Sequence, residues 1–167
     1  MGYIAKVQHL CYNIRYIAKE KGLEGLVCTF FGHRQCFDLD RAVLENAIVE
    51  LINLGVDQFY VGNQGQFDAM VRSCLKALQG RYPHIRYGVV LAYLPTENSE
   101  YADHKDTMYP PIEGHPKFAI TRRNRWMIAE SDYCICYIDH TWGGAYQFAA
   151  LAKRSGLTVT NLGKAAL

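Results

Sequence analysis

Short apolar runs alternate with segments of helical periodicity along most of the chain. Apolar runs that end near turn residues predict strands over residues 26–31, 58–61, 85–94, 132–138 and 157–160. Between them, apolar residues recur at helical spacing and predict helices over residues 40–54, 67–78, 118–130 and 145–154. Strands that alternate with helices are typical of parallel sheets covered on both faces. We therefore expect an α/β fold, a Rossmann-like three-layer sandwich with a central parallel sheet of about five strands.

Two segments fall outside this alternation, and the first is the N-terminal one. Residues 1–25 carry apolar residues at helical spacing, which predicts an amphipathic helix appended to the domain. Two uses of this helix remain open: it packs on the flank of the sheet, or it forms a surface through which two copies of the chain associate. Residues 26–167 are then expected to form a single domain, since domains commonly have roughly 100–200 residues.

The second segment, residues 95–116, contains four of the five prolines and shows no periodicity. A loop of this length inside a compact domain commonly has a function. Aromatic and imidazole side chains lie in it or beside it, namely Tyr93, Tyr101, His104, Tyr109 and His115. Two interpretations remain open: these rings stack on a bound base as part of a lid, or they cover the edge of the core or a second subunit.

Charge and composition argue against several classes of protein. Half of the 167 residues are hydrophobic, which is enough for a full core and rules out intrinsic disorder. The 18 basic and 16 acidic side chains give a net charge of only +2, whereas a duplex-DNA binder needs a concentrated positive surface. The longest apolar run, residues 89–94, is far too short to cross a bilayer. We therefore expect neither nucleic acid nor a membrane as a partner.

The cysteines and the N-terminus favour a cytoplasmic protein. Six cysteines are present, none in a Cys-x-x-Cys motif, so buried and reduced thiols are the simplest interpretation. Cys134 and Cys136 stand two apart in an apolar run, so both should point to the same face of a strand. No Cys/His pair is matched by a second pair at ligand spacing, so we expect no metal site. The N-terminus has no apolar stretch of the secretory type.

The expected ligand site lies beyond the carboxyl ends of the strands, where open parallel sheets bind their ligands. Glycines follow three of the predicted strands, and there the backbone can approach a ligand while helix N-termini offer amides to an anion. Neither Gly-x-Gly-x-x-Gly after the first strand nor a P-loop motif is present, so no cofactor is expected. The candidate ligand residues at these positions are Gly32, His33, Arg34, Gly62, Gly65, Asp68, Gly143 and Gly144.

Arg123 is expected to point toward this same edge. It shares a helical stripe with Ile120 and Met127, which should face the sheet. Helical side chains lean toward the N-terminus, and a helix that precedes a parallel strand begins at the ligand edge. A guanidinium in that place suits a bidentate contact with phosphate. The alternative is a structural ion pair with Asp68 or Asp139.

These residues together resemble the SLOG superfamily, the group named for the Smf/DprA and LOG proteins, and most of all its small bacterial YpsA-type members. The resemblance covers roughly residues 26–163. It implies a Rossmann-like fold, frequent homodimers, and binding of nucleotides or nucleotide-derived molecules, and it adds Asn124 and Ala145 to the candidate ligand residues. The motifs that carry it are Thr29-Phe-Phe-Gly-His-Arg34, Gly62-x-x-Gly65-x-x-Asp68, Arg123-Asn124-x-x-Met127 with Ser131-Asp132, and Gly143-Gly144-Ala145.

The LOG branch of this superfamily is similar to phosphoribohydrolases, which cleave the N-glycosidic bond of a nucleoside monophosphate. The resemblance assigns them an Arg, which Arg123 matches, and a Glu in a Gly-Gly-x-Gly-Thr-x-x-Glu motif. This chain departs from the second motif, because Ala145 stands in the place of Thr, and Gln147 and Phe148 occupy the positions where the carboxylate is expected. A carboxylate stabilises oxocarbenium-like charge and activates water, whereas glutamine does neither.

The sequence leaves three hypotheses of different classes. The favoured one is a sensor or regulatory module that binds a nucleotide or an ADP-ribose-like molecule without efficient catalysis. The second is an enzyme, a nucleoside monophosphate N-glycosidase or a deoxyribosyltransferase-like protein, with Asp68, Asp139 and His33 as candidate acids and bases. For His33 a structural hydrogen bond is an equally good interpretation. The third, nucleic-acid binding as in the Smf/DprA branch, is opposed by the near-zero net charge.

Overall fold

The computed structural model describes residues 25–94 and 106–167. The helix predicted for the N-terminal residues therefore lies outside the described residues, as do Tyr101 and His104. The strands of the described part are β1 (Leu26–Gly32), β2 (Val56–Val61), β3 (Arg86–Val90), β4 (Thr107–Met108), β5 (Tyr133–Tyr137) and β6 (Thr158–Asn161). Its helices are α2 (Arg41–Asn53), α3 (Gln66–Arg81), the 3₁₀ helix η1 (Pro116–Phe118), α4 (Ala119–Ala129) and α5 (Gly143–Arg154).

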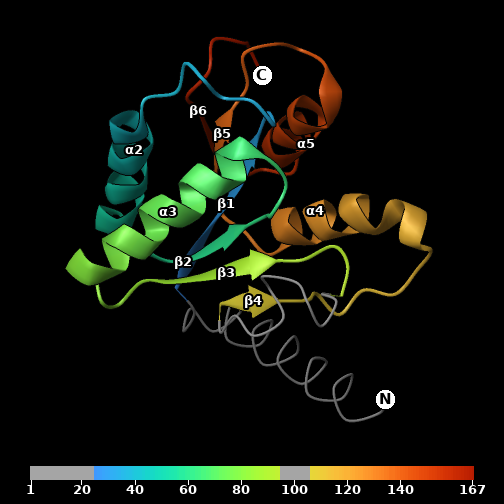
Figure 1. Ribbon diagram of the computed structural model, residues 1–167, viewed down its shortest axis with the longest axis horizontal. Coiled ribbons are helices and arrows are strands. Elements are labelled where there is room, and N and C mark those ends of the chain that lie inside the picture. The colour runs from blue at the N-terminus through green and yellow to red at the C-terminus, as the bar shows by residue number, and fades with distance from the viewer. Residues whose placement is uncertain (1–24, 95–105) are drawn as a thin grey trace.

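The strands form one sheet in the order β4-β3-β2-β1-β5-β6, and every neighbouring pair is parallel. From β1 the chain adds β2, β3 and β4 toward one edge, and then returns to add β5 and β6 on the other side of β1 (Figure 1). The direction of building thus reverses between β1 and β5. Crevices at such a switch point are where open α/β sheets bind their ligands.

Helices cover both faces of the sheet, and each face has its own core (Figure 1). Successive residues of β1 serve opposite faces, as the period of two in a strand requires. Phe30 packs with residues of α2 and α3 such as Ile48 and Leu75, whereas Val27 packs with residues of α4 and α5 such as Met127 and Ala149. The predicted Rossmann-like three-layer sandwich is therefore confirmed.

The sheet has six strands in the described residues, where about five were predicted. The additional strand, β4, lies inside the segment predicted to be a long loop. It pairs with β3, and the N–H of Leu91 donates to the carbonyl of Met108 (2.9 Å). Two residues are too short to show an alternating pattern, so only pairing with β3 defines this strand. The strand predicted over residues 85–94 is also shorter than expected, since β3 ends at Val90.

The helices differ in how they begin. The side chain of Asp40 caps α2 by accepting a hydrogen bond from the N–H of Ala42 (2.8 Å). In contrast, the N-cap residues of α3 and α5, Gly65 and Trp142, make no side-chain cap hydrogen bond. Both of these helices start shortly after a strand, so their N-terminal amides lie at the carboxyl edge of the sheet.

The cysteines agree with the sequence-based expectation where they are described. Cys28, Cys36, Cys74, Cys134 and Cys136 are free and buried. Cys134 and Cys136 belong to the same core cluster, so they point to the same face of β5, as predicted. Within residues 25–94 and 106–167, no helix has the length and apolar character needed to cross a membrane.

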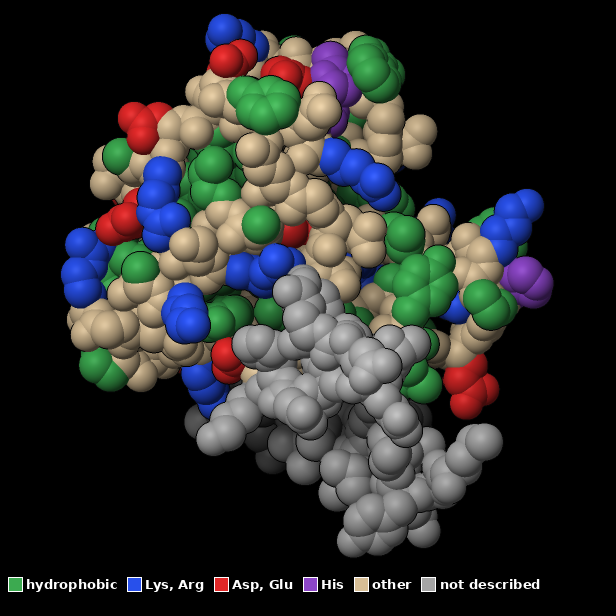
Figure 2. All heavy atoms as spheres, viewed as in Figure 1, with side chains coloured by type: hydrophobic (Ala, Val, Ile, Leu, Met, Phe, Trp, Pro, Cys, Tyr) green, Lys and Arg blue, Asp and Glu red, His purple; other side chains and the backbone are tan. Residues whose placement is uncertain are grey.

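Basic and acidic side chains are mixed on one face of the described part of the molecule (Figure 2). On the face shown in Figure 2, Lys and Arg side chains lie scattered over the described part of the molecule, with Asp and Glu side chains among them. A protein that follows a phosphate backbone presents its positive charge as a patch or a stripe instead. The mixed pattern on this face is in keeping with the net charge of only +2.

Candidate functional site

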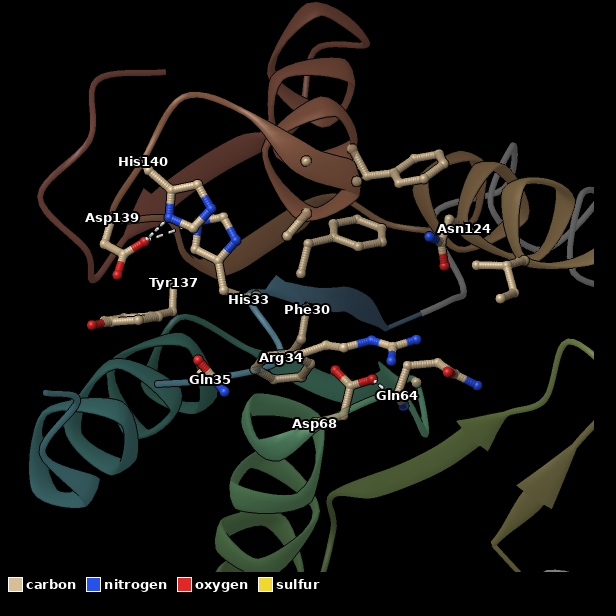
Figure 3. Close-up of a pocket in the computed structure, with 18 of the residues that line it drawn as sticks. Phe30, His33, Arg34, Gln35, Gln64, Asp68, Asn124, Tyr137, Asp139 and His140 are labelled. Carbon is tan, nitrogen blue, oxygen red and sulfur yellow. Dashed lines mark hydrogen bonds and ion pairs between the residues drawn. The ribbon is translucent and has the colours of Figure 1, made fainter. Parts of the chain in front are cut away.

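A pocket of about 750 Å³ opens at the carboxyl edge of the sheet, around the ends of β1, β2 and β5 (Figure 3). Small-molecule sites commonly enclose about 300–1,000 Å³, so a nucleotide-sized ligand fits this volume. The candidate acid Asp139 is among the residues that line it. So are ten of the eleven candidate ligand residues, namely Gly32, His33, Arg34, Gly62, Asp68, Arg123, Asn124, Gly143, Gly144 and Ala145.

The loop after β1 starts at Gly32 because no side chain fits there. A Cβ atom at this position would lie 2.3 Å from the ring of Phe67, which is fully buried at the start of α3. The backbone N–H of His33 donates to the carbonyl of Tyr137 in β5 (3.3 Å), and the His33 side chain is buried. Arg34 is exposed, and its carbonyl accepts a hydrogen bond from the N–H of Gln66 (2.9 Å). The loop thus connects the β5 side of the pocket with the start of α3.

Gly62, the first residue after β2, leaves room for two charged side chains. A Cβ atom there would lie 2.6 Å from Oδ2 of Asp68 and 3.0 Å from Nη1 of Arg123. Both side chains are buried, with exposed fractions of 7% for Asp68 and 3% for Arg123. The carboxylate comes from the first turn of α3, and the guanidinium comes from α4 on the other face of the sheet. Glycine at this position is therefore what lets both layers place a charge in one pocket.

Hydrogen bonds hold Arg123 in place. Its Nη1 donates to the carbonyl of Val90 (2.8 Å) and to Oδ1 of Asn63 (3.5 Å), and its Nε donates to Oδ1 of Asn124 (2.8 Å). Burial lowers the pKa of Arg123, and the negative charge of Asp68 opposes this effect. An arginine in a protein nevertheless stays charged. Arg123 thus presents a fixed positive charge in the pocket, and Asn124 positions it.

Asp68 is a buried carboxyl group at the start of α3. Its Oδ2 accepts a hydrogen bond from the backbone N–H of Gln64 (2.8 Å). Burial raises the pKa of Asp68 to about 6, although the N–H of Gln64 and the charges of Arg123 and Arg72 act in the opposite direction. A carboxyl group with a pKa near 6 exchanges its proton close to neutral pH, as a general acid or base requires. Such a shift at a pocket residue is typical of functional sites.

The N-terminus of α5 faces open space. Its N-cap, Trp142, is 70% exposed, and the first turn contains no acidic residue. A Cβ atom at Gly143 or at Gly144 would meet nothing within 4 Å, and the φ of +89° at Gly143 favours glycine. The first N–H groups of a helix have no partner within it and carry partial positive charge. Because Gly143, Gly144 and Ala145 line the pocket, these groups are available to a bound anion.

His33, Asp139 and His140 form what we call the His–Asp–His cluster, on the β5 side of the pocket (Figure 3). The rings of His33 and His140 stack with centroids 3.6 Å apart and planes inclined by 10°. Oδ1 of Asp139 lies 3.2 Å from Nε2 of His33 and also pairs with Nδ1 of His140. Burial, followed by the charge of His140, lowers the pKa of His33, while the charge of Asp139 raises it. The lowered pKa favours the neutral form of the His33 imidazole.

The positions where the LOG motif would supply a carboxylate hold other groups. Gln147 is exposed, and Phe148 lines the pocket with its ring stacked on Phe31 at a centroid distance of 5.8 Å. An aromatic ring thus forms this part of the wall. The carboxylates among the lining residues are Asp38, Asp68 and Asp139.

Some predicted residues lie elsewhere. Gly65 is not among the lining residues, because it packs behind them: its φ is +92°, and a Cβ atom there would lie 2.8 Å from the Cα of Arg34. The described aromatic residues of the expected lid do not line the pocket either. Tyr93 donates to the carbonyl of Pro116 (3.4 Å), Tyr109 packs against the core, and His115 caps η1.

Several lining residues carry no clear functional signal in the sequence. The most informative are His140, Phe37 and Trp142, and the last two are 78% and 70% exposed. Their signal in the sequence is weak, because a polar or aromatic residue shortly after a strand is common in any loop. Two large exposed aromatic rings that line the same pocket are less common than one such residue in a loop. Phe37 and Trp142 are far apart in the sequence, and only the folded structure brings both to the pocket.

No family model matches the chain, and no curated protein matches it. The geometry of the pocket is therefore the main basis for proposing a function, and the resemblance to the SLOG superfamily remains a prediction from the sequence motifs.

Proposed function

We propose that this protein binds a nucleotide or a nucleotide-derived molecule such as an ADP-ribose-like compound, and that it acts as a sensor or regulatory module. The pocket at the switch point of the sheet is the binding site. In this proposal the phosphate lies against the N-terminus of α5, in the pocket that Arg123 also lines. SLOG membership, a homodimeric assembly and a cytoplasmic location belong to the same proposal and rest on the sequence.

The observation that carries this proposal is the convergence of positive groups on a pocket of nucleotide size. Arg123 is 3% exposed, yet it lines a cavity of about 750 Å³. The uncapped amides at Gly143 and Gly144 line the same cavity. A buried guanidinium and a helix N-terminus are both favourable partners for a phosphate. A ligand without negative charge would gain no electrostatic attraction from the guanidinium or from the helix N-terminus.

The part of the pocket wall formed by α5 favours binding without turnover, because it offers no carboxylate to the ligand. Phe148 and the exposed Gln147 stand where a glycosidase of the LOG type would supply its carboxylate. Loss of a general acid or base commonly costs about 10²–10⁴-fold in rate. The pocket thus offers a buried guanidinium and free helix amides to a phosphate, but no carboxylate on the wall formed by α5.

The experiment that tests this proposal places a negative charge at the N-terminus of α5. In Gly144→Asp the new carboxylate points into open space, so the fold is retained, but it competes with a bound phosphate for the amides. Binding of nucleoside monophosphates, ADP-ribose and the matching nucleosides is measured by calorimetry and by thermal shift. The wild-type protein should prefer the phosphorylated compounds, and Gly144→Asp should weaken their binding by more than about tenfold, or about 1.4 kcal/mol.

The matched control is Gly80→Asp, which adds the same charge at an exposed position near the end of α3 where a Cβ atom also meets nothing. It should bind the phosphorylated compounds as the wild-type protein does. Equal binding of nucleotides and nucleosides by the wild-type protein, or equal losses in both variants, would overturn the proposed phosphate site.

A second candidate function is an N-glycosidase acting on nucleoside monophosphates, and the pKa of Asp68 favours it. This carboxyl group combines a pKa of about 6 with a place on the pocket wall, as a general acid would. Chromatography of the same incubations would reveal a released base. Turnover that disappears in Asp68→Asn would establish the enzyme, whereas binding without base release would leave the sensor.

A further inference from the structure

The His–Asp–His cluster offers three groups that ligate metal ions, on the wall of the pocket. We propose that His33, Asp139 and His140 bind a divalent transition-metal ion at the switch point between β1 and β5. Two imidazole nitrogens and one carboxylate oxygen suit ions such as Zn²⁺, Fe²⁺ or Co²⁺, whereas Mg²⁺ and Ca²⁺ prefer oxygen ligands alone. No sequence motif indicated this site, because His33 stands far from the other two residues along the chain.

The spacing of the donor atoms fits an ion. Ligands bound about 2.1 Å from a metal in a tetrahedral or octahedral site lie roughly 3.0–3.4 Å from one another. Nε2 of His33 and Oδ1 of Asp139 are 3.2 Å apart. Within residues 25–94 and 106–167, this is the one set of three His, Cys, Asp or Glu side chains whose ligand atoms all lie within 4.8 Å of one another.

An unsatisfied nitrogen provides the second, independent observation. The side chain of His33 is 10% exposed, and its Nε2 atom is buried without a hydrogen-bond partner among the described residues. Its contact with Asp139 is close, but it does not have the geometry of a hydrogen bond. A buried polar atom without a partner costs free energy, and such atoms commonly mark an ion or water that completes the site. His33 is a lining residue of the pocket, so an ion that enters the pocket reaches its buried Nε2 atom once the partly exposed side chains of Asp139 and His140 turn aside.

Occupation requires a small rearrangement of the rings. The imidazoles now stack almost parallel, so one ion cannot lie in the plane of both. The side chains of His140 and Asp139 are 32% and 39% exposed, and they therefore have room to turn, while the buried His33 stays in place. Three protein ligands leave at least one coordination position open. That position faces the pocket, so the ion would add positive charge to the wall opposite Asp68.

The test uses the full chain without a polyhistidine tag and without nucleotide, so it is independent of the proposed function. Co²⁺ is titrated into the protein and its visible d–d absorption is followed, and Zn²⁺ is then added as competitor. We expect one Co²⁺ per chain, displaced by Zn²⁺. Removal of a ligand in His33→Ala or His140→Ala should weaken Co²⁺ binding by more than about tenfold, since even changes behind a ligand cost about 10–100-fold.

His84→Ala is the matched control, because His84 is exposed and lies on the turn before β3, outside the pocket. It should bind Co²⁺ as the wild-type protein does. Circular dichroism verifies that each variant is folded, and the partly exposed His140 gives a variant that does not depend on filling the buried space of His33. Absence of saturable Co²⁺ binding, near-ultraviolet bands typical of thiolate ligands, or binding that persists in both histidine variants would overturn the site.

Discussion

The two sides of the pocket differ in how deeply their polar groups are buried and in how many hydrogen bonds these groups make within the protein. On the β2 side, Asp68 and Arg123 are buried, and backbone groups of the protein already satisfy them, the N–H of Gln64 for the acid and the carbonyl of Val90 for the base. On the β5 side, Asp139 is partly exposed and the amides at the start of α5 have no side-chain cap. The groups on the β2 side are held in place by hydrogen bonds within the protein, whereas the groups on the β5 side have fewer bonds of this kind.

From this difference we infer that the β2 side keeps the pocket rigid and that the β5 side contributes more of the binding energy. Groups that are already held by hydrogen bonds fix the shape and charge of the pocket before binding, so a ligand does not have to order them. Exposed side chains and free helix amides can form a new hydrogen bond with a ligand without breaking a bond within the protein. Substitutions on the β2 side should therefore lower stability, and those on the β5 side should lower ligand affinity.

The largest loss of stability is expected from Arg123→Ala. The substitution removes the hydrogen bonds to Val90 and Asn124, and it takes away the stronger of the two positive charges, those of Arg123 and Arg72, that act on the buried carboxyl of Asp68. A hydrogen bond made by a charged group is commonly worth about 1.5–3 kcal/mol, so the loss of the bonds to Val90 and Asn124 should reach about 3 kcal/mol or more. Urea unfolding measures it. His140→Ala, on the β5 side, should cost less than about 1 kcal/mol, and equal losses would contradict the comparison.

Asp68→Asn should change how stability depends on pH. Burial raises the pKa of Asp68 from its ordinary value of 3.8 to about 6, so between these values the folded state holds a proton that the unfolded chain has released. The contribution of Asp68 to wild-type stability then falls as pH rises through this window, by up to about 3 kcal/mol. The amide that replaces the carboxyl group in Asp68→Asn keeps an oxygen that accepts from Gln64 but cannot ionise.

Thermal unfolding at pH 4 and at pH 7.5 tests this effect. The stability of Asp68→Asn relative to the wild-type protein should be greater at pH 7.5 than at pH 4. Parallel pH profiles for the two proteins would show that burial does not raise the pKa of this carboxyl group.

Gly62→Ala and Gly144→Ala make the same change on the two sides of the pocket. A methyl group at Gly62 would crowd Asp68 and Arg123, whereas at Gly144 it meets nothing within 4 Å. Overpacking of this kind commonly costs about 1–3 kcal/mol, and an exposed substitution stays within about 0.5 kcal/mol. Chemical denaturation of the pair gives the difference directly, and a larger loss in Gly144→Ala would reverse the assignment of the two sides.

The smallest effect on stability is expected from Trp142→Ala. The indole is 70% exposed, so its removal should change the free energy of unfolding by less than about 0.5 kcal/mol. It nevertheless lines the pocket beside His140, with ring centroids 3.9 Å apart, and can stack on a base. Loss of such stacking commonly costs about 1–3 kcal/mol of binding. Phe118→Ala removes an exposed ring outside the pocket, and calorimetry should find its nucleotide affinity unchanged.

Much of the fold could be predicted from the sequence because long elements carry their own pattern. β1 and β5 are buried apolar runs, and α2 and α3 repeat their apolar residues at helical spacing. β4 could not be predicted, since two residues have no period and exist as a strand only through β3. The convergence of glycine loops on one edge was also open to prediction, because parallel strands share the direction in which they end.

The sequence by itself determined the alternation of strands and helices, the loops that follow the strands, and the balance of charge. The tertiary structure alone decided which loops meet. The order of strands placed β5 beside β1, and so brought His33 to Asp139 and His140. It also decided the environment of Asp68, because a carboxyl group acquires a raised pKa only when other elements exclude water from it. The local pattern of apolar residues determines the helices and strands. Contacts between distant segments, and the burial they cause, determine the chemical properties of the site.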